Sequence, residues 1–291
     1  MGWLLQHGAW CGCQDGVGAA VERGQVPQGG VLDVASASVA RMTNYLLGGK
    51  DHYAADREAC AQLLEVVPTA REVAMAAHWF LLRVTSLLAR EHGVRQFVVF
   101  GTGLPTAVGV HHVAQAVDGR SHVVYADDDA LALVHCRAMW EDWRRTLVMR
   151  AGPLQAEQLL LGPEVRRLIT LDEPTAVMFV SVLHTIAQPA EAAGVLEQVA
   201  GLLAPGSFIA ASHLVSEDAQ VRGRADALYQ QASAGRWGPV RPRAEVVGCF
   251  GSLPLLRPGL VDVCQWRPGG DRMAAAGSWA WAEHGAVAFV R

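Results

Sequence analysis

The sequence lacks the features that direct a protein to a polyanion or a membrane. Its 24 lysines and arginines are outnumbered by 28 aspartates and glutamates, which gives a formal net charge of -4. No basic run is present that would bind nucleic acid or anionic lipid. No apolar stretch reaches the length that crosses a bilayer, and the first residues lack the basic start and long apolar core of a signal peptide. We therefore expect a cytoplasmic protein with neither a nucleic-acid nor a membrane partner.

Cysteine is scarce and suggests no metal site. Cys11 and Cys13 are separated by one residue, which is the wrong spacing for a zinc knuckle, and no second pair complements them. The remaining four cysteines stand in apolar surroundings that are typical of buried thiols: Cys60, Cys136, Cys249 and Cys264. No motif for zinc, haem or a nucleoside triphosphate is present. We expect a reduced protein without a metal.

Lysine is almost absent. The only one is Lys50, and every other basic side chain is arginine. Lys50 lies in the densest cluster of polar and glycine residues, over 41–58, two glycines after a predicted helix. An ammonium group is a compact charge with a tunable pKa, which a planar guanidinium does not replace. Two readings stay open: a functional contact, or a solvated lysine beside a helix C-cap.

The first third of the chain is predicted to be a leader followed by helices. Residues 1–30 are glycine-rich and aperiodic, which is typical of a flexible leader. Residues 31–93 are predicted to form a helical N-terminal cap. Its expected helices run from Ser36 or Ser38 to Leu47, from Asp51 to Val67, and over residues 71–91.

The pattern then changes to alternating strands and helices over residues 94–268. The expected strands cover 97–100, 122–126, 146–149, 176–183 and 207–213, with helices over 105–117, 130–143 and 190–203. Residues 245–250 and 260–266 are predicted to form a closing antiparallel hairpin. Residues 269–291 are expected to be a C-terminal tail, in which Trp279, Trp281 and a last apolar run indicate one more strand or an interface. Repeated units with continuously apolar strands predict a doubly wound, mostly parallel α/β sheet with an antiparallel edge.

Ligands of such sheets bind at the carboxyl ends of the strands, near the point where the strand order reverses. That rule selects Gly101, Thr102, Gly103, Asp127, the turn at 150–152, His184 and His213. The two glycines allow a ligand to approach the backbone closely. Asp127 could accept both hydroxyls of a ribose, or it could belong to a helix N-cap that Asp128 or Asp129 would supply equally well. Three successive acids exceed what a cap needs, which favours the ribose reading.

Three stretches carry a resemblance to a known family. They are residues 40–58, residues 101–106, and residues 202–213 with their Pro205-Gly206 turn, and residues 250–267 fit as well. Over residues 35–268 the chain resembles the actinobacterial S-adenosylmethionine-dependent methyltransferases that carry a helical N-terminal extension. The resemblance implies a seven-stranded class I sheet with S-adenosylmethionine over the first two strands. The implied cofactor contacts are Gly101, Thr102, Gly103, Asp127 and Asp128.

Two positions depart from the family pattern. The resemblance implies an acid at the position of Val99, where it would hold the methionine amino group, and an acid near the adenine at the position of Gly152. Each lost charge-assisted hydrogen bond could cost about 1.5–3 kcal/mol, so two losses would weaken binding by ~100-fold or more. The sequence therefore predicts a partly degraded cofactor site, although S-adenosylmethionine could still bind.

The polar cluster of the cap is almost intact by comparison. It retains Arg41, Asn44, Tyr45, Lys50, Asp51, Asp56 and Arg57. This contrast favours an enzyme repurposed for nucleophilic displacement on a small natural-product intermediate, without S-adenosylmethionine as methyl donor. An internal amine would close an aziridine-like ring and expel an anionic group such as sulfate or phosphate.

The candidate catalytic residues follow from that hypothesis. Lys50 and Arg41 would contact the leaving group, and Tyr45 belongs to the same cluster. Asp51, Asp56 or His184 would take the amine proton. Two alternatives remain: a small-molecule methyltransferase that uses S-adenosylmethionine, and a non-catalytic subunit that binds a partner enzyme. Whether the chain forms a homodimer or needs a partner chain also stays open.

Overall fold

A computed structural model describes residues 33–235, 237–268 and 280–291. The expected leader over 1–30 and Trp279 lie outside this part of the chain. The sheet has seven strands in the order β3-β2-β1-β4-β5-β7-β6. The parallel strands are β1 (Gln96–Phe100), β2 (His122–Asp127), β3 (Thr146–Arg150), β4 (Thr175–Phe179) and β5 (Phe208–Val215). Strands β7 (Ala282–Phe289) and β6 (Val261–Asp262) complete it in antiparallel pairing. The predicted doubly wound sheet with an antiparallel edge is confirmed.

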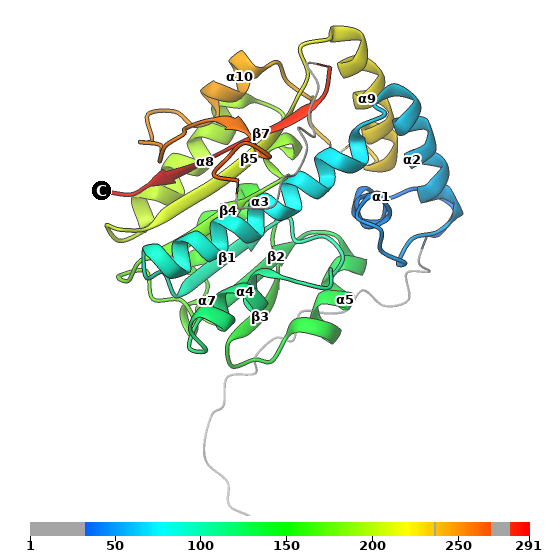
Figure 1. The fold of residues 1–291 in the computed structure, drawn as a ribbon. Helices are drawn as coiled ribbons and strands as arrows, with labels where there is room; N and C mark the ends of the chain where they lie inside the picture. Colours follow the sequence, from blue (N-terminus) through cyan, green and yellow to red (C-terminus); the bar gives the residue numbers. More distant parts are fainter. Residues whose placement is uncertain (1–32, 236, 269–279) are drawn as a thin grey trace, which may run out of the picture. The chain divides into compact units, whose positions relative to one another are not determined.

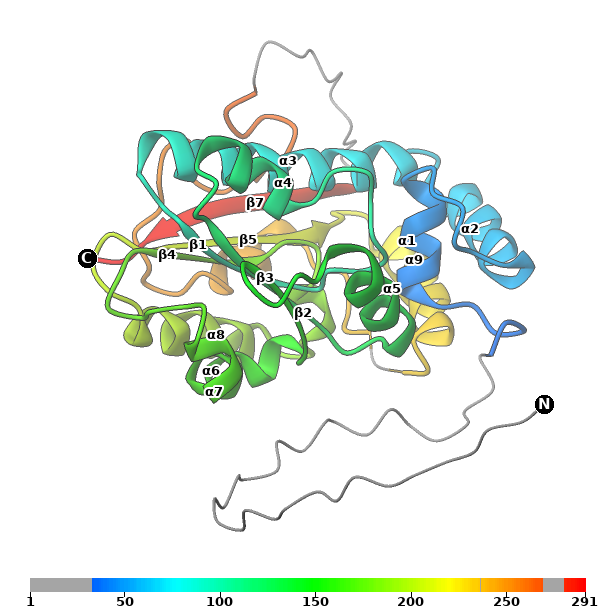
Figure 2. The ribbon, with the colours of Figure 1, turned by 90° about the horizontal axis from the view of Figure 1, so that it is seen from below.

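Helices cover both faces of the sheet (Figures 1 and 2). One face packs against α3 (Ala70–Glu91), α4 (Val110–Val117) and α5 (Ala130–Trp140). The other packs against α6 (Ala156–Leu161), α7 (Pro163–Arg166), α8 (Pro189–Leu202) and α10 (Arg243–Gly248). Side chains alternate along β1, so that Phe97 and Val99 face the first layer and Val98 and Phe100 face the second. Burial on both faces explains why the strands are continuously apolar.

A third apolar core joins the N-terminal helices to the sheet. Helices α1 (Val39–Leu46), α2 (Ala54–Val66) and α9 (Ala219–Ala232) enclose Met42, Leu63 and Tyr229, which pack with Trp237 and Trp281. We call α1, α2 and α9 the helical cap; Figure 1 shows them beside one another. Helix α3 is long and apolar enough to cross a membrane by length and composition, but half of that window is buried in the structure. Phe80 and Leu88 of α3 belong to the sheet core, so α3 acts as a core helix.

Several sequence predictions near the C-terminus were wrong. Residues 243–248 form helix α10 instead of a strand, because Val246, Cys249 and Phe250 recur at helical spacing and pack into the α8 layer. Of residues 260–266, only Val261 and Asp262 are in a strand. The last apolar run does form one more strand, as one of its two interpretations had it: residues 282–289 are β7, the long antiparallel partner of β5. Short apolar runs do not distinguish strand from helix by periodicity alone.

Two helix starts also differ from expectation. Helix α2 has Tyr53 as its N-cap rather than Asp51, because the carboxylate of Asp56 accepts the backbone N–H of Tyr53 at 2.7 Å. Helix α4 begins at Val110 and leaves residues 101–109 as an extended turn after β1. The short 3-10 helices η1 (Pro153–Gln155) and η2 (Leu183–Thr185) follow β3 and β4. The turns after β1, β2, β3 and β4 therefore meet at one edge of the sheet, which we call the carboxyl edge.

Candidate functional site

The turn after β1 needs glycine at two positions. Gly101 and Gly103 have φ of +70° and +64°, in the left-handed region that side chains rarely adopt. A Cβ on Gly101 would lie 2.7 Å from the Cβ of Val182, in the turn after β4. A Cβ on Gly103 would meet nothing within 4 Å. The first glycine therefore allows two turns to pack together, and the second leaves its surroundings open.

Asp127 connects the turns after β1 and β2. Its Oδ2 accepts the backbone N–H of Gly103 at 2.7 Å, and its Oδ1 accepts that of Asp129 at 2.9 Å. The residue is 9% exposed. Burial raises the pKa of this carboxyl to about 6, although both backbone hydrogen bonds oppose the shift. Each oxygen keeps a lone pair, so Asp127 can still accept the hydroxyls of a ribose.

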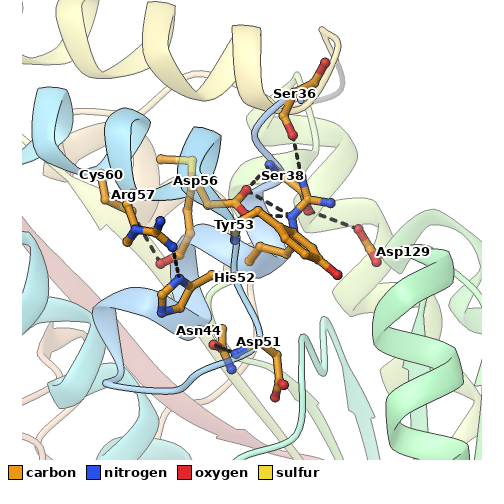
Figure 3. Close-up of polar contacts among 12 residues, drawn as sticks. Ser36, Ser38, Asn44, Asp51, His52, Tyr53, Asp56, Arg57, Cys60 and Asp129 are labelled. Atoms are coloured by element: carbon orange, nitrogen blue, oxygen red, sulfur yellow. Dashed lines mark hydrogen bonds and ion pairs between the residues drawn. The ribbon is translucent and has the colours of Figure 1, made fainter. Parts of the chain in front are cut away.

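The helix cap after β2 is supplied by Asp129. Its Oδ1 accepts the backbone N–H groups of Leu131 and Ala132, which leaves Asp127 free of that role. The hydroxyl of Ser38 donates to Asp129 Oδ2 at 3.3 Å, as Figure 3 shows. Asp128 is exposed. The start of α1 is thus attached to the carboxyl edge directly beside the candidate cofactor residues.

The two positions that depart from the family pattern hold no carboxylate. Val99 is buried in the apolar core beneath α3 and α4. The backbone N–H of Gly152 donates to Oε1 of Gln155 at 2.9 Å, so an amide side chain closes the turn after β3. The residues present therefore fit the ribose of a nucleoside cofactor through Asp127. At positions 99 and 152, no acid is present that could contact the methionine or adenine end of the cofactor.

Arg41 and Asp56 form a buried ion pair inside the cap. The Nε of Arg41 donates to both oxygens of Asp56, at 3.0 and 2.8 Å, and its Nη2 donates to the carbonyl of Ser36. Asp56 also accepts the backbone N–H groups of Ser38 and Tyr53 (Figure 3). These contacts occupy the carboxylate and fix the start of α1 against the start of α2. A role in stabilising the cap therefore explains why Arg41 and Asp56 are buried together. These contacts give no support to the catalytic roles predicted for them.

Asn44 explains the glycines before Lys50. Its Oδ1 accepts the backbone N–H of Asp51 at 3.0 Å, and its carbonyl accepts the N–H of Gly49 at 2.8 Å. A Cβ on Gly49 would lie 2.3 Å from Asn44 Nδ2, and Gly48 has a φ of +80°. The turn after α1 is thus built around the amide of Asn44.

The remaining candidates of the polar cluster lie outside the Arg41–Asp56 pair. Lys50 and Asp51 are exposed on the turn after α1, and Lys50 forms no hydrogen bond or ion pair with the described residues. The ring of Tyr45 packs edge-on against His52, 5.0 Å between centroids, and beneath the guanidinium of Arg71. The cluster therefore contains a buried ion pair, Arg41 with Asp56, and two exposed residues, Lys50 and Asp51, that form no ion pair with each other. The predicted catalytic roles of Lys50, Asp51 and Tyr45 stay predictions.

His184 and His213 lie in a buried aromatic group at the ends of β4 and β5. His184 packs 4.0 Å from the ring of Trp237 and 5.7 Å from His213, and neither of its ring nitrogens has a hydrogen-bond partner among the described residues. Burial, with His213 and Arg241 nearby, lowers the pKa of His184 well below its usual value. His213 contacts a guanidinium nitrogen of Arg241, and burial lowers its pKa to about 4. Both imidazoles are thus neutral at pH 7.

Sequence reasoning missed a carboxylate and two hydroxyls at the same edge. Glu283 of β7 accepts hydrogen bonds from Ser181, after β4, and Ser212, in β5. Glu283 is the one acid in the apolar run over 281–289, and that isolation in a buried strand was the available signal. The contact itself joins residues about a hundred positions apart, which no local pattern reveals.

The strand order reverses between β1 and β4, and the glycine turn and Asp127 lie beside that point. This combination defines a Rossmann-like α/β protein whose candidate ligand site lies at its topological switch point. The chain belongs to the S-adenosyl methyltransferase family, whose pattern matches residues 26–291. The predicted family is thereby confirmed.

Two solved structures are similar over nearly their whole length. One is a DUF574-family protein from Streptomyces avermitilis, with 32% identity over 89% of this chain and 99% of that one, and a TM-score of 0.79. The other is a candidate methyltransferase from Thermobifida fusca, with 30% identity over 88% of this chain and 97% of that one, and a TM-score of 0.78. No functionally curated protein matches the chain.

Proposed function

We propose that the protein is an S-adenosylmethionine-dependent methyltransferase that acts on a small molecule. The observation that carries the proposal is the link between the Gly101–Gly103 turn and Asp127 at the switch point of the sheet. Membership of the S-adenosyl methyltransferase family supports it. It replaces ring closure, the first hypothesis from the sequence, as the leading function.

The chain's own residues would bind and align the reactants. Asp127 would accept the ribose hydroxyls, and the open surroundings of Gly103 would admit the ligand close to the backbone. When bound, S-adenosylmethionine supplies a methyl group on a positively charged sulfur. Helix α1, attached through Ser38 and Asp129, would keep water from the reacting groups. Alignment of nucleophile and methyl carbon supplies most of the rate enhancement in a displacement of this kind.

A second candidate function is favoured by one observation, the apolar side chain of Val99 where an acid is expected. In that reaction an amine nitrogen attacks carbon within the same substrate. The N–C bond closes a ring, the carbon–oxygen bond to sulfate or phosphate breaks, and the amine proton passes to the exposed carboxylate of Asp51. Exposed Lys50 would contact the departing anion.

Titration calorimetry with S-adenosylhomocysteine separates the two functions. A methyltransferase should bind this product at micromolar concentration. Asp127→Asn should weaken binding by about tenfold or more, because it removes the charge from the ribose contact. Asp172→Asn, in an exposed loop before β4, is the matched control and should bind as the wild type does. Wild-type protein that shows no binding at millimolar concentration would refute the methyltransferase and favour ring closure.

A further inference from the structure

A buried carboxyl group lies at the carboxyl edge, separated from the candidate nucleoside site on β1 and β2 by strands β4 and β5. Glu283 is 2% exposed and stands opposite Leu214, next to the last residue of β5. Its Oε1 accepts the hydroxyl of Ser181 at 2.6 Å and that of Ser212. The backbone N–H of Ser181 in turn donates to Ser212 Oγ at 2.8 Å. The three residues form a closed network across β4, β5 and β7.

This carboxyl group has no positive partner in the described part of the chain. No ion pair reaches it there. Both serine hydroxyls donate to Oε1, and a further donor near the carboxyl is the neutral backbone N–H of Ser181. Its charged neighbour is another acid, Asp262, and burial raises the pKa of Glu283. A buried carboxylate without a counter-charge is unfavourable, so a cation that reaches Oε2 would stabilise the ionised form of the group.

Ser181 connects the network to the candidate cofactor turn. It follows β4 with a φ of +55°, a backbone conformation that is uncommon for serine and often occurs at functional sites. The residue is half-buried, so it is accessible from the carboxyl edge. Its neighbour Val182 packs against Gly101 with no room for an added methyl group. A ligand at the glycine turn would therefore lie beside Ser181.

We propose that Glu283, together with Ser181, binds a positively charged or protonatable nitrogen of a ligand. The inference rests on the proposed methyltransferase function and specifies the chemistry recognised at that site. An amino group can come from two sources: the amino-acid end of the cofactor, or an amine acceptor of the methyl group. In both cases Oε2 provides the counter-charge. Ser181 Oγ, whose proton is directed to Oε1, accepts a hydrogen bond from the same nitrogen.

Calorimetry with two adenosine probes tests the first source. S-adenosylhomocysteine carries the amino group, and 5′-methylthioadenosine lacks it. Glu283→Gln keeps the size and the serine hydrogen bonds but removes the charge, and Ser181→Ala leaves the acid in place. If the cofactor is the source, both variants should weaken S-adenosylhomocysteine binding, Glu283→Gln by about ten- to hundredfold, and leave methylthioadenosine unchanged. The control Glu173→Gln, an exposed acid before β4, should alter neither.

A matched pair of non-nucleoside probes tests the second source. Phenethylamine and 2-phenylethanol differ chiefly in the amine, and both are titrated with and without S-adenosylhomocysteine. An acceptor site predicts that Glu283→Gln removes binding of the amine and not of the alcohol. If neither the adenosine pair nor this pair separates wild type from Glu283→Gln, the assignment is overturned. Wild-type protein that binds neither adenosine probe refutes the methyltransferase, whereas the amine pair still tests Glu283.

Discussion

In the helical cap, the buried guanidinium of Arg41 contacts the buried carboxylate of Asp56, whereas the buried carboxyl of Glu283 accepts hydrogen bonds from Ser181 and Ser212 and forms no ion pair with the described residues. Both acids lie in the interior, and both accept hydrogen bonds. The difference is the counter-charge, which one acid has within the chain and the other lacks there. Complete pairing points to a structural role, and incomplete pairing at a sheet edge points to binding.

The largest effect on stability should come from removing the ion pair between Arg41 and Asp56. Arg41→Met removes the counter-charge of Asp56 and leaves a buried acid with backbone donors only. We expect a loss of about 3–5 kcal/mol in the free energy of unfolding, measured by urea denaturation. Arg57→Met, at an exposed guanidinium that contacts His52, should change it by less than about 0.5 kcal/mol. An Arg41→Met protein of wild-type stability that has lost activity would instead assign Arg41 to catalysis.

Glu283, which has no counter-charge among the described residues, should make the stability of the protein depend on pH. Burial raises the pKa of Glu283, so the folded state favours the protonated form. The stability that this provides is present below the unfolded pKa, about 4.3, and is lost as the pH rises toward the folded-state value. Relative to Glu283→Gln, the ligand-free wild type should lose about 1.4 kcal/mol for each unit of the shift. Asp262 and Tyr229 lie nearby and stay unchanged in both proteins. A stability difference that is independent of pH would contradict the unpaired state.

Asp127 is a third buried acid, whose hydrogen-bond donors are backbone N–H groups. It should give a smaller effect, seen in ligand affinity and not in stability. With a pKa of about 6, it is mostly ionised at pH 7 and mostly protonated at pH 5. The affinity for S-adenosylhomocysteine should therefore fall by about tenfold between these values if the ionised form holds the ribose. Calorimetry at both pH values measures it. Asp127→Asn should show a flat profile, and a variant that keeps the wild-type slope would assign the titration to another group.

The smallest change in stability is expected at Lys50. Its side chain is exposed and forms no hydrogen bond or ion pair with the described residues, so Lys50→Met should alter the free energy of unfolding by less than about 0.5 kcal/mol. Thermal unfolding measures this. If turnover falls while stability holds, the ammonium contacts an anionic group of the substrate. Unchanged turnover would leave Lys50 as a solvated residue on the turn that Asn44 builds.

The sequence predicted features that depend on local pattern. Continuous apolar runs located β1, β2 and β3 to within one residue at either end, and the glycines at 101 and 103 marked the turn at the switch point. Helix α10 was mistaken for a strand because its apolar run is as short as a strand. Helix α9 has few buried residues, Ala225 and Tyr229, and its weak pattern was not predicted.

The site was only partly predictable for a related reason. Asp127 is the last residue of β2, so its position could be inferred from the end of the apolar run over 122–126. The pairing of Arg41 with Asp56 needs two helices in contact, and the network of Glu283 needs three strands in register. Such partners decide whether a charged residue is structural or free to bind, and sequence spacing does not contain them.

The contact between Val182 and Gly101 has a thermodynamic consequence. Because an added methyl group would not fit between them, a shift of the turn after β1 toward Val182 displaces the turn after β4. Ligands bound at the two turns should therefore influence each other's affinity, and by the same factor in both directions. Calorimetric titration of S-adenosylhomocysteine with and without the co-substrate, and of the co-substrate with and without S-adenosylhomocysteine, should give equal coupling factors.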